Sequence, residues 1–198
     1  SRSSAASDVY KRQDNYNQVG IGASAGRTNQ GLRAVAIGGV SGQSNQGDYS
    51  IAMGWASGYS DQGIRSVAIG DGAGFSAQDQ YSVAIGSGAG YTSQQSETIA
   101  IGRDAGNTSQ GTNSIAIGKD AGKISQSDNT ICLNATGSTV AANTNTDACY
   151  IAPIREDTSG NGQVLYYDNT TKEVLQSDVG FSLAVSYTHL RAHETLRY

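Results

Sequence analysis

Apolar and polar residues recur along the middle of the chain with a fixed spacing of 16 residues. An apolar residue followed by glycine forms the isoleucine column, Ile21, Ile37, Met53, Ile69, Ile85, Ile101 and Ile117. A second apolar position two residues earlier in each unit forms the valine column, Val35, Ile51, Val67, Val83, Ile99, Ile115 and Ile131. A small residue, mostly alanine, separates the two columns. This alternation with a period of two predicts a short β-strand in every repeat.

Three further columns complete the repeat. Glycine follows the isoleucine column directly, and a second glycine column stands four residues later at 26, 42, 58, 74, 90, 106 and 122. The glutamine column is Gln30, Gln46, Gln62, Gln78, Gln94, Gln110 and Gln126. A 16-residue unit is too short for a helical repeat but holds two short strands and two tight turns. The sequence therefore predicts an all-β fold, a parallel β-roll or β-solenoid of 16-residue coils.

The strand written Ser-Val-Ala-Ile-Gly, as in 82–86, has two regular faces. One face is aliphatic and the other is small, so we expect its own coil to cover one and partner chains to cover the other. Both columns, together with Ala84 and Ala116, are thus candidates for the core and a homotrimer interface. Glutamate at either alanine is expected to place a charge in the seam between chains, that is, in this interface.

The second strand of each coil ends at the glutamine column. The residue two positions earlier is serine or threonine in nearly every unit, whereas the neighbours of both positions vary. We expect both to point inward, with the glutamine amides hydrogen-bonded from coil to coil in a Gln ladder.

The units SVAIGDGAGFSAQ (66–78) and SIAIGKDAGKISQ (114–126) resemble the head repeats of YadA-like trimeric autotransporter adhesins, and the fibre repeats of phages and large viruses. The resemblance covers about 19–132. It implies a left-handed β-roll that trimerises along its length, and an extracellular, cell-surface or virion location. Residues 150–178 are similar to the β segment that follows such repeats in viral fibres, and 164–176 read independently as a hairpin.

Composition narrows the chemistry. The formal charge is −4 and proline occurs once, so nucleic-acid binding and proline-rich linkers are disfavoured, and no apolar run is long enough to span a membrane. Asp71, Asp104 and Asp120 fit solvated turns better than calcium sites. Cys132 and Cys149, 17 residues apart, should face opposite sides of the sheet, which disfavours a bridge between them. We expect no cofactor, no metal and no catalytic residue.

Both ends of the chain resemble translated sequencing-library adaptors, at 1–13 and 185–198. Setting them aside removes His189 and His193, the two histidines. The remaining organisation is predicted as a repeat region at 14–132, a transition at 133–149, and a short β segment with the hairpin at 150–184.

Three successive coils carry aromatic residues at one position, Tyr59, Phe75 and Tyr91, with Trp55 nearby in sequence. Such a row either stacks on itself to stabilise the roll or offers ring faces to the sugars of a host glycan. The main hypothesis is a non-enzymatic trimeric fibre or adhesin head that attaches to host cells through a glycan or protein receptor. The alternatives are a glycan-binding or ice-binding solenoid and a fragment of a tailspike enzyme. The long period and the regular AG-x-[ST]-x-Q second half of the repeat favour the viral or phage-like variants of this resemblance.

Overall fold

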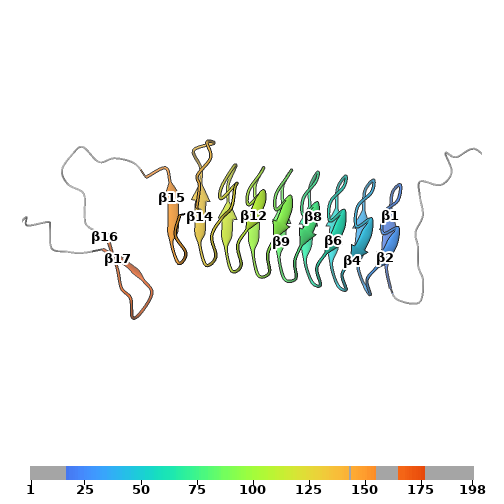
Figure 1. The fold of residues 1–198 in the computed structure, drawn as a ribbon, viewed down its shortest axis with the longest axis horizontal. Coiled ribbons are helices and arrows are strands. Elements are labelled where there is room, and N and C mark those ends of the chain that lie inside the picture. The colour runs from blue at the N-terminus through green and yellow to red at the C-terminus, as the bar shows by residue number, and fades with distance from the viewer. Residues whose placement is uncertain (1–16, 143, 155–164, 177–198) are drawn as a thin grey trace, which may run out of the picture. The chain divides into compact units, whose positions relative to one another are not determined.

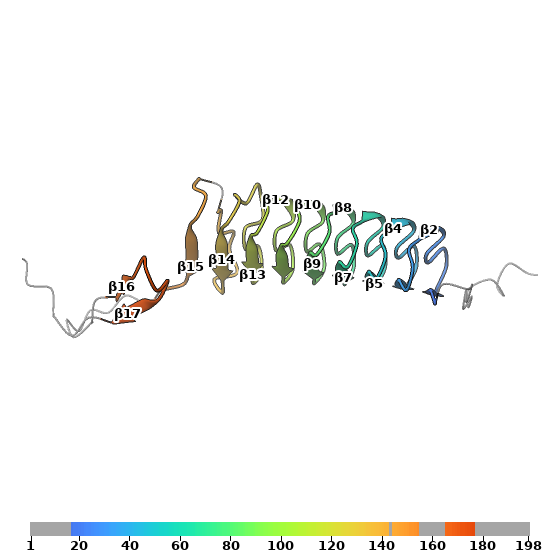
Figure 2. The same cartoon turned by 90° about the horizontal axis from the view of Figure 1, so that it is seen from below.

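The computed structural model describes residues 17–142, 144–154 and 165–176, in which the regular elements are β-strands joined by turns. The chain divides into two units, 1–154 and 155–198. Figures 1 and 2 show the first unit as a row of narrow coils stacked side by side along one axis. Residues 1–13 and 185–198, in which we predicted adaptor sequence, lie outside the described residues. None of the described elements is a helix with the length and apolarity that a membrane crossing requires.

The first six coils each contribute one strand to each of two parallel sheets, and the later coils contribute to one sheet only. The nine-stranded sheet consists of β1 (Val19–Ile21), β3 (Val35–Ile37), β5 (Ile51–Met53), β7 (Val67–Ile69), β9 (Val83–Ile85), β11 (Ile99–Ile101), β13 (Ile115–Ile117), β14 (Ile131–Asn134) and β15 (Cys149–Ala152). The six-stranded sheet consists of β2 (Thr28–Gln30), β4 (Ser44–Gln46), β6 (Ser60–Gln62), β8 (Ser76–Gln78), β10 (Thr92–Gln94) and β12 (Thr108–Gln110). The predicted parallel β-solenoid is confirmed.

The register of the nine-stranded sheet follows the sequence columns. Strands β7 and β9 pair Val67 with Val83 and Ile69 with Ile85, so each residue lies beside its equivalent 16 positions on. The sheet also runs beyond the regular repeats, because β14 pairs with β15 through Ile131 and Cys149. The spacing ends near residue 132, but the parallel sheet continues to Ala152. Cys132 is buried and Cys149 exposed, and both are free thiols, as their predicted opposite orientation requires.

The interior of the coil is built from small and amide side chains. Alanines between the aliphatic columns, among them Ala68, Ala84 and Ala116, are fully buried, and so are Gln78 and Gln94. The aliphatic columns point the other way and are partly exposed. The two faces of the strand are therefore resolved: the small face is the core, and the aliphatic face is open in a single chain.

The glutamine column joins the two sheets across the interior. Gln94 Nε2 donates to the carbonyl oxygen of Val83 at 2.9 Å, and the same bond recurs in each coil from Gln30 to Gln126. A bond between glutamines occurs once among the described side chains, from Gln62 to Gln78 at 3.2 Å. The predicted inward orientation is confirmed. The predicted coil-to-coil ladder is wrong as the main interaction. Each glutamine donates to a strand carbonyl across its own coil, which lies closer than the glutamine of the next coil.

The serine or threonine two residues before each glutamine is partly exposed, contrary to the expectation that it points inward. The intervening residue adopts a left-handed conformation, with φ of 55° at Asp61 and 54° at Ala77. This twist breaks the alternation of an extended strand, so two positions separated by one residue no longer share a face.

Glycine is required where the coils approach closely. Gly70 has φ of 131°, and a Cβ there would lie 2.7 Å from the carbonyl group of Gly86 in the next coil. At Gly74 a Cβ would lie 2.6 Å from Oε1 of Gln78. The first glycine column thus permits coil stacking, and the second leaves room for the buried amide.

The second unit contains a two-stranded antiparallel sheet. Strands β16 (Leu165–Tyr167) and β17 (Val174–Gln176) pair Tyr166 with Leu175. Asp168 closes the turn, because its carboxylate accepts hydrogen bonds from the amides of Thr170 and Thr171. The predicted hairpin is confirmed.

We expect Gln94→Glu to lower the free energy of unfolding by about 2–5 kcal/mol at pH 7, because it removes the donor to Val83 and buries a carboxylate among carbonyl oxygens. Chemical denaturation of both variants measures this. Gln95→Glu is the matched control, since that neighbouring side chain is exposed. Equal stability of the two variants would refute the role assigned to the column.

Val40 is β-branched and adopts φ of 52°, where glycine stands at positions 72 and 88 of two later coils. Relief of this strain is expected to make Val40→Gly neutral or stabilising by up to about 1 kcal/mol, despite the added freedom of the unfolded chain. Val35→Gly, in an extended strand, should instead destabilise the protein. A lower thermal midpoint for Val40→Gly would contradict the argument.

Candidate functional site: an aromatic groove on one edge of the coils

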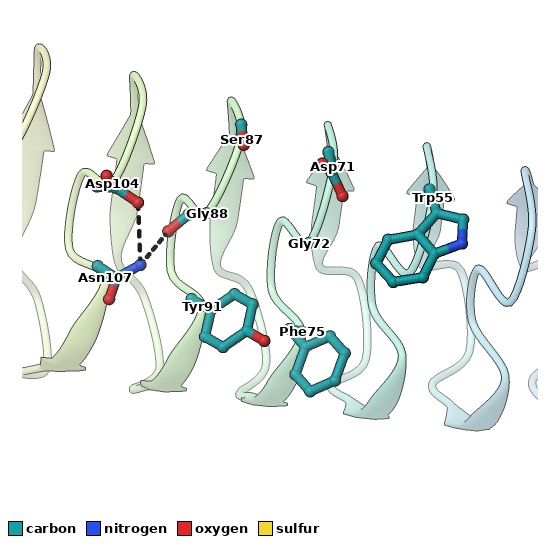
Figure 3. A pocket seen from close by; sticks show the side chains of 9 residues that line it. All are labelled: Trp55, Asp71, Gly72, Phe75, Ser87, Gly88, Tyr91, Asp104 and Asn107. Atoms are coloured by element: carbon teal, nitrogen blue, oxygen red, sulfur yellow. Dashed lines mark hydrogen bonds between the residues drawn. The ribbon is translucent and has the colours of Figure 1, made fainter.

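A groove of about 450 Å³ crosses the turns that follow the strands of the nine-stranded sheet. Figure 3 shows that its aromatic and polar side chains come from successive coils. The lining residues are Trp55, Asp71, Gly72, Phe75, Ser87, Gly88, Tyr91, Asp104 and Asn107. All of them occupy three repeat positions, the second, third and sixth after the isoleucine column.

Phe75 and Tyr91 of the predicted aromatic row form one wall, whereas Tyr59 stacks behind them and does not line the groove. The rings of Tyr59 and Phe75 have centroids 4.8 Å apart and those of Phe75 and Tyr91 4.7 Å apart, with 5° between the planes in both pairs. The side chains therefore stack on one another, which was one of the two roles expected of them. Tyr91 at the end of the row is 38% exposed.

Trp55 lies at the other wall and is 64% exposed. Its indole leans over the preceding coil, where a Cβ on Gly39 would lie 3.2 Å from its Cδ1 atom. Figure 3 shows this ring system apart from the rings of Phe75 and Tyr91, on the far side of the groove. Trp55 was predicted as part of the same surface, and the structure places it there.

The polar end of the groove is ordered by Asn107. Its Nδ2 donates to the carbonyl oxygen of Gly88 at 2.8 Å and lies 3.4 Å from Oδ1 of Asp104. The side chains of Asp71 and Ser87 form no hydrogen bond or ion pair with the described part of the chain. They leave a carboxylate and a hydroxyl free along the groove.

An ion-pair cluster borders this end. Asp120 lies 2.9 Å from Nζ of Lys119 and 2.8 Å from Nζ of Lys123, which also lies 3.3 Å from Asp104. The hydrogen bonds from Lys123 and Lys119 hold the pKa of Asp120 below its ordinary value of 3.8. The bond to Asp120 raises the pKa of Lys123 above 10.5. The described side chains contain no cluster of three His, Cys, Asp or Glu that could hold a metal ion.

The aliphatic columns form a second candidate surface on the outer face of the nine-stranded sheet. Met53 is 38% exposed and Ile117 39%, while most other members are half-buried. Ala84 and Ala116, which we also predicted for this interface, are fully buried inside their own coil. A charge at either alanine would therefore enter the interior of the coil, and not the seam between chains.

A second ladder was not predicted. Arg33, Tyr49, Arg65 and Tyr81 alternate 16 residues apart, with Arg65 5.3 Å from the ring centroid of Tyr49 and its Nη1 3.0 Å from the hydroxyl of Tyr81. These cation–π and hydrogen-bond contacts tie four exposed turns together. The sequence contained an indication of this ladder, because Arg and Tyr alternate at one repeat position.

The repeats match a known family. Residues 62–89 and 96–121 fit the family model of the YadA head domain repeat, one copy each. These two segments are similar to YadA head domain repeats, which confirms the predicted resemblance for this part of the chain. No curated protein and no solved structure matches the chain.

Because the folded-state pKa of Asp120 is depressed, its ion pairs contribute stability that is full above pH 3.8 and lost as the pH falls through the lower folded-state value. Asp120→Asn should therefore lower the free energy of unfolding at neutral pH by about 1–3 kcal/mol and flatten its decline in acid. Thermal unfolding between about pH 2 and pH 7 measures both effects. Asp71→Asn is the control, and an unchanged acid limb in Asp120→Asn would contradict the assignment.

Proposed function

We propose that this chain is the non-enzymatic head region of a trimeric surface adhesin, in which three copies pack through the aliphatic columns and present their turns outward for attachment. The YadA head domain repeats at 62–89 and 96–121 support this role, since such repeats are structural domains of adhesins exposed on bacterial surfaces. Trimerisation and attachment are carried over from that family.

The proposal depends on which residues of the strand are buried: the small residue faces the core and the aliphatic residues face outward. In Val83–Ile85 the alanine is buried and both aliphatic side chains are left partly exposed. The same arrangement recurs from coil to coil, so the aliphatic side chains form a stripe along the whole sheet. Continuous apolar surfaces of this kind mark interfaces, and a closed rotational assembly covers the stripe of every copy equally.

A trimer also compensates for the thin core. Alanine, serine and glutamine bury little apolar area inside the coil, whereas a fully buried valine or isoleucine contributes about 1.5–3 kcal/mol. Association would therefore bury the valine and isoleucine columns of each chain. The coils supply length and the trimer supplies rigidity.

Light scattering on the full chain at micromolar concentration tests the assembly. We expect three chains per particle, and we expect Ile85→Asp to reduce the mass to that of one chain, because it places uncompensated charge in the proposed seam. Ala77→Asp is the matched control. It adds the same charge on the six-stranded sheet, at the position that Asp61 occupies in the preceding coil.

A second comparison separates association from folding. Ala84→Glu is expected to abolish the β-sheet circular dichroism signal, since its side chain would enter the coil interior, whereas Ile85→Asp should retain more of the signal. A wild-type chain that stays folded and monomeric, indifferent to Ile85→Asp, would exclude the trimer.

A further inference from the structure

We propose that the groove between Trp55 and Tyr91 binds a neutral oligosaccharide laid along the axis of the coils. This deepens the proposed attachment function, on which it rests, by naming the chemical class of the receptor. The argument uses the floor of the groove, its aromatic walls and its free polar groups in turn.

The turns beneath the groove carry two glycines that the backbone does not demand. Gly72 and Gly88 occupy the third position after the isoleucine column, with φ of 62° and 66°. The same position carries Ala56 at 52° and Asp104 at 56°, so other residues adopt this conformation in neighbouring coils. Glycine therefore leaves room for side chains of the following coil, which lie over both residues. A Cβ on Gly72 would lie 3.1 Å from the ring of Tyr91.

The walls are flat and apolar. The parallel rings of Phe75 and Tyr91 form a platform that repeats with the spacing of the coils, and the indole of Trp55 faces the groove from the other side. Aromatic rings provide apolar area with little conformational freedom to lose. Sugar rings have apolar C–H faces and a rim of hydroxyl groups, so a row of sugars can lie on such a platform while its rim reaches polar side chains.

The free polar groups are mainly hydrogen-bond acceptors. The carboxylate of Asp71 has no partner among the described residues, and the donors of Asn107 already bond to Gly88 and Asp104. Sugar hydroxyls can donate to the free acceptors. An anionic sugar would instead meet the negative charge of Asp71, and the residues that line the groove include no Lys or Arg to offset it. The nearby Lys123 is paired with Asp104 and Asp120. The groove therefore favours neutral over sialylated glycans.

A quaternary ammonium ion is the competing ligand, since aromatic rings and a carboxylate also bind cations. Such a site needs several rings that enclose one point. Here two of the rings are parallel to within 5° and succeed one another along the axis, which suits an extended ligand better than a compact one.

Trp55 is the one tryptophan of the chain, so its fluorescence reports on this groove alone. The full chain is titrated with cellotetraose, maltotetraose, tetra-N-acetylchitotetraose, sialyllactose and choline chloride. We expect a saturable change with at least one of the three neutral tetrasaccharides, and affinity at least tenfold weaker for sialyllactose and choline. No saturable change with any neutral tetrasaccharide, or tighter binding of choline or sialyllactose, overturns the proposal.

Variants assign the binding to the groove, measured by isothermal titration with the best neutral probe. Tyr91→Ala and Gly72→Ala should each weaken it about tenfold or more, the first by removing a ring face and the second by displacing the ring of Tyr91. Tyr81→Ala, an exposed aromatic outside the groove, is the control. Circular dichroism verifies folding, and unchanged affinity in folded Gly72→Ala and Tyr91→Ala overturns the assignment. Light scattering on the same samples reports the trimer separately, so failure of one proposal is distinguishable from failure of the other.

Discussion

The hydrogen bond from each buried glutamine to the strand across the coil is the interaction on which the rest of this structure depends. A coil of 16 residues is so narrow that the two sheets approach without room for a layer of large apolar side chains. The glutamine side chain is long enough to span the gap and carries two donors. In Gln110 these donors reach the carbonyl oxygens of Ile99 at 2.9 Å and Ser114 at 3.4 Å. One side chain thereby satisfies two buried carbonyls and sets the distance between the sheets.

The buried glutamine limits which residue types fit at the neighbouring positions. The carboxamide oxygen of the glutamine lies against the second glycine column, and Oε1 of Gln94 has no hydrogen-bond partner in the described region. The strand opposite can offer only a small side chain, so alanine points inward and its aliphatic neighbours point outward. The usual order of apolar inside and polar outside is reversed within the coil. A chain built in this way has its aliphatic columns on the outside, and this is the surface that the proposed trimer would cover.

Most of the fold could be predicted from the sequence, because every coil repeats the same residue types at the same spacing. The pairing of Val67 with Val83 and the inward glutamine followed directly from the columns. The face that forms the core did not, since alternation shows that a strand has two faces but not which of them is covered. The left-handed residue at Asp61 was also hidden, because asparagine, aspartate, alanine and serine all occupy that position.

The groove itself could not be predicted, because no short stretch of the sequence shows which side chains of neighbouring coils meet. The side chain at the sixth position of each coil leans over the third position of the preceding coil, 19 residues earlier: Asn107 reaches Gly88, and Lys123 reaches Asp104. A surface site is therefore assembled from residues of four coils. Since the folding columns are the glycines, the glutamine and the buried small residues, these surface positions can change from coil to coil without altering the backbone. The repeat thus separates the residues that hold the solenoid together from those that give one stretch of it a distinct surface chemistry.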